Sequence, residues 1–217
     1  MNPHPSLDPR LYLVLDPTQC RDPVEVARAA VAGGATLVQL RHKHADTCEL
    51  LDLARALVTA LPVPLLINDR VDVALATNAA GVHVGQRDMP AGEARRLLGE
   101  QAIIGLTVRS LAETRAALEA PVDYLSIGGV HATRSKQNPD PPIGLDGLRE
   151  IVERLRGHGC ELPLTAISGI QAGQIPAVLA CGVQGVALVS ALCAAADPQS
   201  AARDLRGIVD AGSGSAP

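Results

Sequence analysis

The chain has no phenylalanine and no tryptophan, and it has only two tyrosines and two methionines among 217 residues. Proteins that bind nucleic acids by base stacking need exposed aromatic rings, so this composition excludes stacking as a main mode of binding. A net charge of −4 likewise lacks the basic surface that DNA or RNA requires. The core must therefore be built from leucine, valine, isoleucine and alanine, within an apolar content of 47%.

Signals for export, membrane insertion and cysteine frameworks are also missing. The five cysteines are widely spread and form no C-x-x-C pair, so neither a disulfide framework nor a zinc knot is predicted. The longest apolar run, residues 186–196, is shorter than the about 20 residues that cross a bilayer. Residues 1–6 lack the basic-then-apolar pattern of an export signal. We therefore expect a cytoplasmic protein that contacts neither membrane nor nucleic acid.

What the chain does contain is one unit repeated along its length. Short runs rich in leucine and β-branched residues alternate with longer amphipathic stretches, as in parallel strands joined by helices. Eight strands are predicted at residues 11–15, 36–41, 64–68, 81–84, 103–107, 124–127, 163–167 and 185–189. The predicted fold is therefore α/β, a single-domain (β/α)8 TIM barrel. An open doubly wound sheet is less favoured, because no G-x-G-x-x-G follows the first strand.

The length of 217 residues suits one such domain. We assign residues 11–211 to the catalytic barrel. Residues 1–10 are predicted to be a flexible extension, and residues 212–217 a flexible tail.

Two acidic residues stand where neighbouring strands end. Asp69 follows the third predicted strand and Asp88 follows the fourth, so both carboxylates should meet at one edge of the barrel. Mg²⁺ typically takes one or two protein carboxylates and completes its shell with water and phosphate oxygens. Taken singly, Asp69 suits a helix N-cap and Asp88 a turn. Taken as a pair, they indicate a magnesium site.

Other polar side chains gather at the same ends of the predicted strands, where TIM barrels hold their chemistry. Gln39, Arg41 and Lys43 alternate along the second strand, so they share a face that suits an anion, or else a solvated rim. The segment 128–144 after the sixth strand is long and polar, which is typical of a functional lid or a mobile loop. The loops after strands seven and eight, with Gly169 and Ser190, suit a phosphate.

Taken together, four segments resemble thiamine phosphate synthase over roughly residues 11–205. They are Gln39-Leu40-Arg41-His42-Lys43, Ile67-Asn68-Asp69-Arg70, the stretch from Gly81 to Asp88, and Ile167-Ser168-Gly169-Ile170. Members of that family are (β/α)8 barrels that join a hydroxymethylpyrimidine diphosphate to a thiazole phosphate, releasing diphosphate. The resemblance implies an enzyme of this kind, a transferase with small-molecule substrates, and it leaves a homo-oligomer open.

The resemblance also implies roles for individual residues. The pyrimidine diphosphate site would comprise Gln39, Arg41, Lys43 and Asn68. Asp69 and Asp88 would hold Mg²⁺, the expected cofactor. Thr107 stands near the pyrimidine, where the family usually has a serine. The thiazole phosphate site would comprise Thr133, Ser135, Gly169, Val189 and Ser190, with Lys136 on the diphosphate. Among these, Lys136, Arg41 and Thr107 are the predicted catalytic residues.

The chain departs from the family pattern in two places. The lid has Gly129, His131, Ala132 and Ser135 where the family often reads otherwise, and an aromatic residue is missing there. Ser168 replaces a usual glycine. His131 keeps a thiazole tautomerase-like barrel as the alternative enzyme, and a non-catalytic barrel that binds a phosphorylated metabolite is the alternative outside enzymes.

Overall fold

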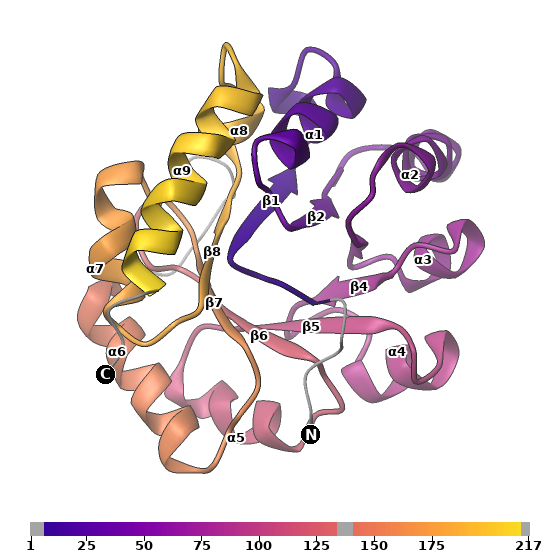
Figure 1. Cartoon of the computed structure of the whole chain (residues 1–217). Coiled ribbons are helices and arrows are strands. Elements are labelled where there is room, and N and C mark those ends of the chain that lie inside the picture. The colour runs from indigo at the N-terminus through magenta and orange to yellow at the C-terminus, as the bar shows by residue number, and fades with distance from the viewer. Residues whose placement is uncertain (1–6, 134–140, 214–217) are drawn as a thin grey trace.

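The computed structural model describes residues 7–133 and 141–213, and its strands close into a parallel barrel in sequence order. Figure 1 looks into this barrel, with the helices arranged around it. The strands are β1 (Leu11–Leu15), β2 (Leu37–Leu40), β3 (Leu65–Asn68), β4 (Gly81–Val84), β5 (Ile103–Val108), β6 (Tyr124–Ile127), β7 (Leu164–Ile167) and β8 (Gly185–Leu188). The TIM barrel predicted from the sequence is confirmed, and β8 pairs with β1 to close the ring.

Helices follow the strands as the repeated unit requires. They are α1 (Pro23–Ala32), α2 (Thr47–Ala60), α3 (Val71–Thr77), α4 (Ala91–Leu98), α5 (Leu111–Glu119), α6 (Gly144–Gly157), α7 (Ile175–Leu179), α8 (Ser190–Cys193) and α9 (Pro198–Ser213), with 3₁₀ turns η1 (Pro17–Gln19) and η2 (Ala172–Gln174). The last helix includes the first residues of the predicted tail. Within residues 7–133 and 141–213, no helix combines the length and apolarity needed to span a bilayer.

Helix starts follow ordinary capping rules. At α2, the Asp46 carboxylate accepts the backbone N–H of Glu49 at 2.9 Å, which satisfies a donor that has no partner inside the helix. The Glu49 carboxylate lies 3.4 Å from Nε2 of His42, in the loop that follows β2. The helix start is thus tied to the strand end, where the polar residues of β2 emerge.

Alternation along each strand divides the core into two layers. Leu11, Leu13 and Leu15 pack outward against the helices, while Tyr12 and Val14 belong to a separate cluster with residues from β2, β3, β5, β6 and β8. A strand turns successive side chains to opposite faces, so the second cluster fills the inside of the barrel. Both tyrosines of the chain lie in this inner layer and are almost fully buried.

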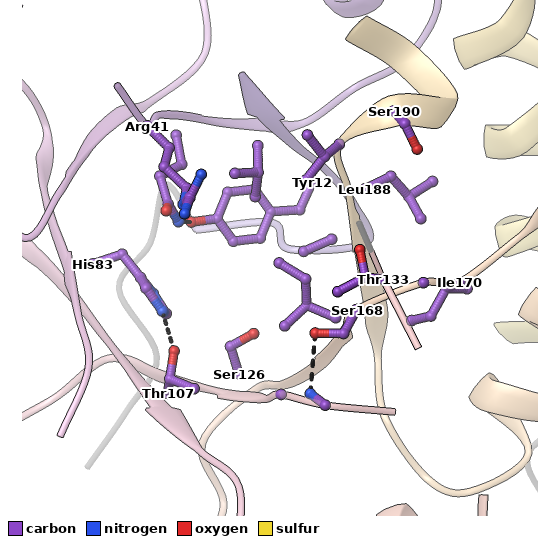
Figure 2. A pocket seen from close by; sticks show the side chains of 18 of the residues that line it. Tyr12, Arg41, His83, Thr107, Ser126, Thr133, Ser168, Ile170, Leu188 and Ser190 are labelled. Carbon is purple, nitrogen blue, oxygen red and sulfur yellow. Dashed lines mark hydrogen bonds between the residues drawn. The ribbon is translucent and has the colours of Figure 1, made fainter. Parts of the chain in front are cut away.

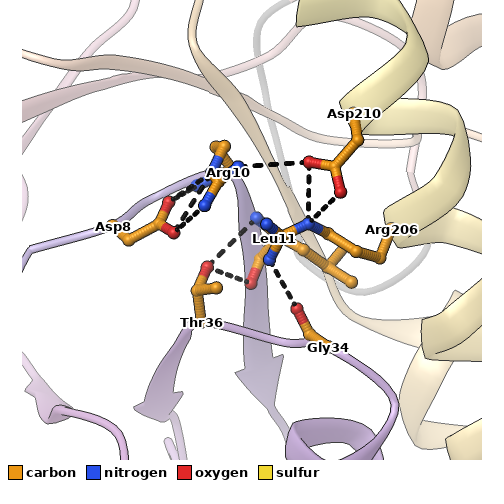
Figure 3. Close-up of polar contacts among 7 residues, drawn as sticks. All are labelled: Asp8, Arg10, Leu11, Gly34, Thr36, Arg206 and Asp210. Carbon is orange, nitrogen blue, oxygen red and sulfur yellow. Dashed lines mark hydrogen bonds and ion pairs between the residues drawn. The ribbon is translucent and has the colours of Figure 1, made fainter.

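Charged side chains join the beginning of β1 to α9 (Figure 3). Arg10 lies 2.7 Å from the Asp8 carboxylate and 3.2 Å from that of Asp210, which also pairs with Arg206 at 2.8 Å. Arg206 donates a further hydrogen bond to the carbonyl of Gly34 at 3.2 Å. We call these four charged side chains the terminal clamp. It ties the last helix to the strand that closes the barrel.

Removing the shared carboxylate of the clamp should cost little, since Arg10 and Asp210 are more than a third exposed. We expect Asp210→Asn to lower the free energy of unfolding by about 0.5–1 kcal/mol, or roughly 1–4 °C in Tm. Asp146→Asn is the matched control, because its partner Arg149 joins it only along one exposed helix face. Equal melting temperatures for both variants and the parent would show that the clamp adds no stability.

Candidate active site

One cavity opens at the carboxyl ends of the strands and encloses about 980 Å³ of empty space, its mouth included. Figure 2 shows side chains from several strands and loops converging on it. Eight of the residues predicted from the sequence line this cavity: Gln39, Arg41, Asn68, Thr107, Thr133, Gly169, Val189 and Ser190. The position expected for chemistry in a TIM barrel is therefore where these side chains meet.

Arg41 brings a cation into the cavity from just beyond the end of β2. Its Nη1 lies 3.2 Å from Oδ2 of Asp16, and both side chains are largely buried. Asp16 also accepts hydrogen bonds from the backbone and hydroxyl of Thr18, which fixes the carboxylate. A guanidinium held on one side by a carboxylate still presents donors on the other side, as anion binding requires.

Lys43, Asp69 and Asp88 form a cluster beside Asn68, outside the lining of the cavity. The Lys43 ammonium group forms an ion pair with Asp69. Asp88 lies close enough to raise the pKa of Asp69, so the two predicted metal ligands are neighbours. Asp88 also accepts the backbone N–H of Gly85 at 2.7 Å, which is the turn contact expected of it on its own.

Burial raises the pKa of Asp69, and the nearby Asp88 carboxylate raises it further, while Lys43 opposes the shift. Asp69 also has a φ of 62°, in the left-handed region that a non-glycine residue rarely adopts. Crowded carboxylates on constrained backbone fit a divalent cation, which would offset their mutual repulsion. Within the described residues there is no group of three or more acidic, histidine or cysteine ligands. Water and phosphate oxygens would therefore have to complete the shell of a Mg²⁺ ion.

The turn after β7 brings the backbone close to the loop after β6. Gly169 has a φ of 65°, and a Cβ atom there would lie 2.2 Å from the carbonyl oxygen of Ala132. Ser168, with a φ of 96°, accepts the backbone N–H of Gly129 through Oγ at 3.1 Å. This bond, drawn in Figure 2, offsets part of the cost of a serine in a conformation that favours glycine.

Sequence reasoning missed a group of buried side chains beneath the cavity. Tyr12, His83 and Ser126 line its floor, and Tyr124 contacts both Tyr12 and His83. His83 lies within the predicted strand 81–84, and the sequence indicates no role for it. The available signal was that the two tyrosines of the chain each fall on a predicted strand of the barrel.

Part of the predicted site cannot be placed. Ser135 and Lys136 lie outside the described residues. His131 is described, and its backbone N–H donates to the carbonyl of Ser168 at 3.0 Å. Its side chain is absent from the lining of the cavity.

Comparisons with known proteins agree with this geometry. The family described as thiamine monophosphate synthase matches residues 11–192. The thiamine-phosphate synthase of Agrobacterium fabrum is 49% identical over 190 residues, covering 86% of each chain. That of Solidesulfovibrio magneticus is 49% identical over 214 residues, covering 96% of this chain and 99% of its own. The structure of thiamine phosphate pyrophosphorylase from Pyrococcus furiosus is similar with a TM-score of 0.82 and 37% identity, covering 94% of this chain and 96% of that one.

Proposed function

The chain belongs to the thiamine monophosphate synthase family of thiamine-biosynthesis transferases, and we propose the reaction that it catalyses and the residues that carry it out. The substrates are 4-amino-2-methyl-5-(diphosphooxymethyl)pyrimidine and 4-methyl-5-(2-phosphooxyethyl)thiazole. The products are thiamine phosphate and diphosphate. The relatives that share up to 49% identity bear the synthase name, which favours this reaction over that of a thiazole tautomerase.

The observation that supports the proposal is that Arg41 and Asn68 line the cavity, while the Asp69–Asp88 pair lies beside Asn68, outside that lining. Gln39, Arg41 and Asn68 line the cavity, and Asp69 is the next residue in the chain after Asn68. A diphosphate lying against Arg41 and Asn68 would reach the carboxylate pair with its far oxygens. The pyrimidine ring would then extend inward toward Gln39 and Thr107.

Substitution at the pyrimidine methylene requires neutralisation of the charge on the departing diphosphate, and it does not require a base. The bond from the methylene carbon to the diphosphate oxygen breaks, and the diphosphate leaves with the electron pair. The thiazole nitrogen then donates its lone pair to the same carbon, and no proton has to be removed. Groups that stabilise a departing anion and orient two rings are sufficient for such a dissociative reaction.

Asp69 and Asp88 would hold Mg²⁺ against the diphosphate. Mg²⁺ supplies positive charge that stabilises the leaving group. Arg41 would neutralise the diphosphate from the side of β2, and Lys43, which forms an ion pair with Asp69, would add a second positive charge there. Because this set contains no general base, the rate should depend on metal more strongly than on the titration of any histidine.

The opposite side of the cavity suits the second substrate. Gly169 and Ser190 follow β7 and β8, where TIM barrels commonly hold a phosphate, and both line the cavity together with Val189 and Thr133. We assign this side to the thiazole phosphate. The resemblance to the family adds Ser135 to the thiazole phosphate and Lys136 to the diphosphate.

The test is a coupling assay that follows diphosphate release while Mg²⁺ is titrated. Thiamine phosphate is detected in parallel by its fluorescent oxidation product. We expect release to require both substrates and the metal. Diphosphate release with the pyrimidine substrate alone would indicate a hydrolase. Binding of either substrate without any product would indicate a barrel that only binds metabolites, and both results contradict the proposal.

A further inference from the structure

Five side chains form a continuous run of hydrogen bonds beneath the cavity, which we call the buried chain. Gln39 donates through Nε2 to the hydroxyl of Tyr12, and that hydroxyl lies 2.8 Å from the hydroxyl of Tyr124. The Tyr124 hydroxyl lies 2.7 Å from Nδ1 of His83. Nε2 of His83 lies 2.8 Å from Oγ1 of Thr107, a bond drawn in Figure 2.

Donor and acceptor roles can be followed along the buried chain from Gln39, with one acceptor for each hydrogen. The amide nitrogen Nε2 of Gln39 can donate but not accept, so the Tyr12 oxygen is the acceptor of this bond. The Tyr12 hydrogen is then donated to the Tyr124 oxygen. Tyr124 has then accepted one bond and gives its hydrogen to Nδ1 of His83. Nδ1 therefore acts as the acceptor, which places the ring hydrogen on Nε2.

The end of the buried chain is at the cavity. Nε2 of His83 donates to Oγ1 of Thr107, so the hydrogen of the threonine hydroxyl must point away from His83. Thr107 and Gln39 both line the cavity. Gln39 uses Nε2 inward and thus has Oε1 left as an acceptor, while Thr107 has a hydrogen to donate.

Burial excludes water that could otherwise replace the hydrogen bonds of the buried chain. Tyr12 and Tyr124 are 1% and 0% exposed, and His83 is 7% exposed. Burial raises the pKa of both tyrosines, so each phenol keeps the hydrogen that it donates. A buried polar group without a partner would destabilise the fold by more free energy than one hydrogen bond contributes. Loss of one bond therefore disfavours the others, and the bonds form as a unit.

The barrel wall is shaped to hold the central link. Gly105 of β5 pairs with Tyr124 in the register of β5 and β6. A Cβ atom at Gly105 would lie 2.2 Å from Cζ of Tyr124 and 2.4 Å from its oxygen. The Tyr124 phenol occupies the space that a side chain at Gly105 would need. The backbone at Gly105 therefore sets the position of the Tyr124 hydroxyl.

We propose that the buried chain fixes His83 as its Nε2–H tautomer and thereby makes Thr107 a donor toward the cavity, with Gln39 as the matching acceptor. The cavity then selects a ring that donates toward Gln39 and accepts from Thr107. An aminopyrimidine does this with its exocyclic amine and a ring nitrogen, and this part rests on the proposed function. Tyr12, Tyr124 and His83 act as positioning residues, since they work through the two side chains that face the ligand.

The tautomer is tested on the free protein, with no turnover involved. Two-bond ¹⁵N–¹H NMR of histidine-labelled protein separates the pyridine-like nitrogen from the one that carries hydrogen. The His83 signal is assigned by its loss in His83→Gln. We expect a pyridine-like Nδ1 and a protonated Nε2. A protonated Nδ1, or fast exchange between both tautomers, would overturn the proposal.

Two phenol deletions give a matched pair for the same measurement. Tyr12→Phe leaves Tyr124 able to donate to His83, so the Nε2–H tautomer should persist. Tyr124→Phe removes the donor to Nδ1, so both tautomers should appear. If the two variants behave alike, the bond between Tyr124 and His83 does not set the tautomer, and the proposal fails.

Ligand selection is tested by equilibrium binding rather than by catalysis. The probes are the aminopyrimidine diphosphate and its 4-oxo analogue, which reverses donor and acceptor along the same edge. We expect the wild-type protein to bind the amino form at least about tenfold more tightly, and Tyr124→Phe to lose most of that ratio. Equal affinities in the wild-type protein would overturn selection by Thr107. Failure of the coupling assay alone would remove the proposed reaction and leave the tautomer and the affinity ratio unaffected.

Discussion

Asp88→Asn should reduce coupling turnover by on the order of 100-fold or more at a fixed, limiting Mg²⁺ concentration. The exchange keeps the shape of the side chain and removes one of the two charges that converge beside the cavity. Changes to residues that only support a metal ligand already cost about 10- to 100-fold, so loss of a ligand should cost at least as much. Asp69→Asn should have a comparable effect, and it also removes the ion-pair partner of Lys43.

Three measurements separate loss of the metal from general damage. Calorimetric titration should show weaker Mg²⁺ binding, and a higher Mg²⁺ concentration should recover part of the rate. The pKa of Asp69 should fall in Asp88→Asn, because the neighbouring negative charge that raises it is gone. Asp72→Asn is the control, since that carboxylate on α3 is exposed and pairs with Arg70, which precedes the helix. Coupling by Asp88→Asn at the wild-type rate without metal would defeat the assignment.

Gly169→Ala should unfold at a markedly lower temperature and bind the thiazole phosphate at least about tenfold more weakly. The added methyl group would lie 2.2 Å from the carbonyl oxygen of Ala132, on backbone whose φ of 65° disfavours alanine. The left-handed conformation costs roughly 1–2 kcal/mol and the overlap about 1–3 kcal/mol. For a chain of this length, a total of about 2–5 kcal/mol corresponds to roughly 4–20 °C in Tm.

Gly173→Ala provides the comparison, because it lies four residues further along the same loop region and a Cβ atom there has no neighbour within 4 Å. Its melting temperature and ligand affinity should match those of the parent. Thermal unfolding and thiazole phosphate titration on both variants check the prediction. A Gly169→Ala protein with unchanged melting and affinity would show that the loops after β6 and β7 can separate without cost.

The barrel could be predicted from the sequence because each strand is a short apolar run that can be recognised without its neighbours. Residues 11–15, 81–84 and 124–127 were placed with the observed bounds, since apolar runs end there at polar or glycine residues. The candidate site residues Gln39, Arg41 and Ser190 follow from the same logic, because the carboxyl ends of parallel strands meet at one edge. Others come from the resemblance to the family. The convergence of Asp69 and Asp88 follows from adjacent strands for that reason.

Contacts across the barrel could not be predicted in this way. Tyr12 and Tyr124 stand on strands β1 and β6, which are not neighbours, and only the closed ring brings their hydroxyls to 2.8 Å. His83 alternates with apolar residues on β4, so its own segment gives no sign that both ring nitrogens are bonded. Such contacts depend on barrel diameter and stagger, which are properties of the whole ring.

The terminal clamp has a consequence for how the protein is made. A ribosome releases β1 long before β8 and α9, yet β1 pairs with β8 and Arg10 forms an ion pair with Asp210. The nascent chain must therefore leave β1 with one edge unpaired throughout most of translation, exposed to pairing with other chains. The lining of the cavity includes Ser190 at the start of α8, so a translation product that ends before Ser190 lacks part of the site.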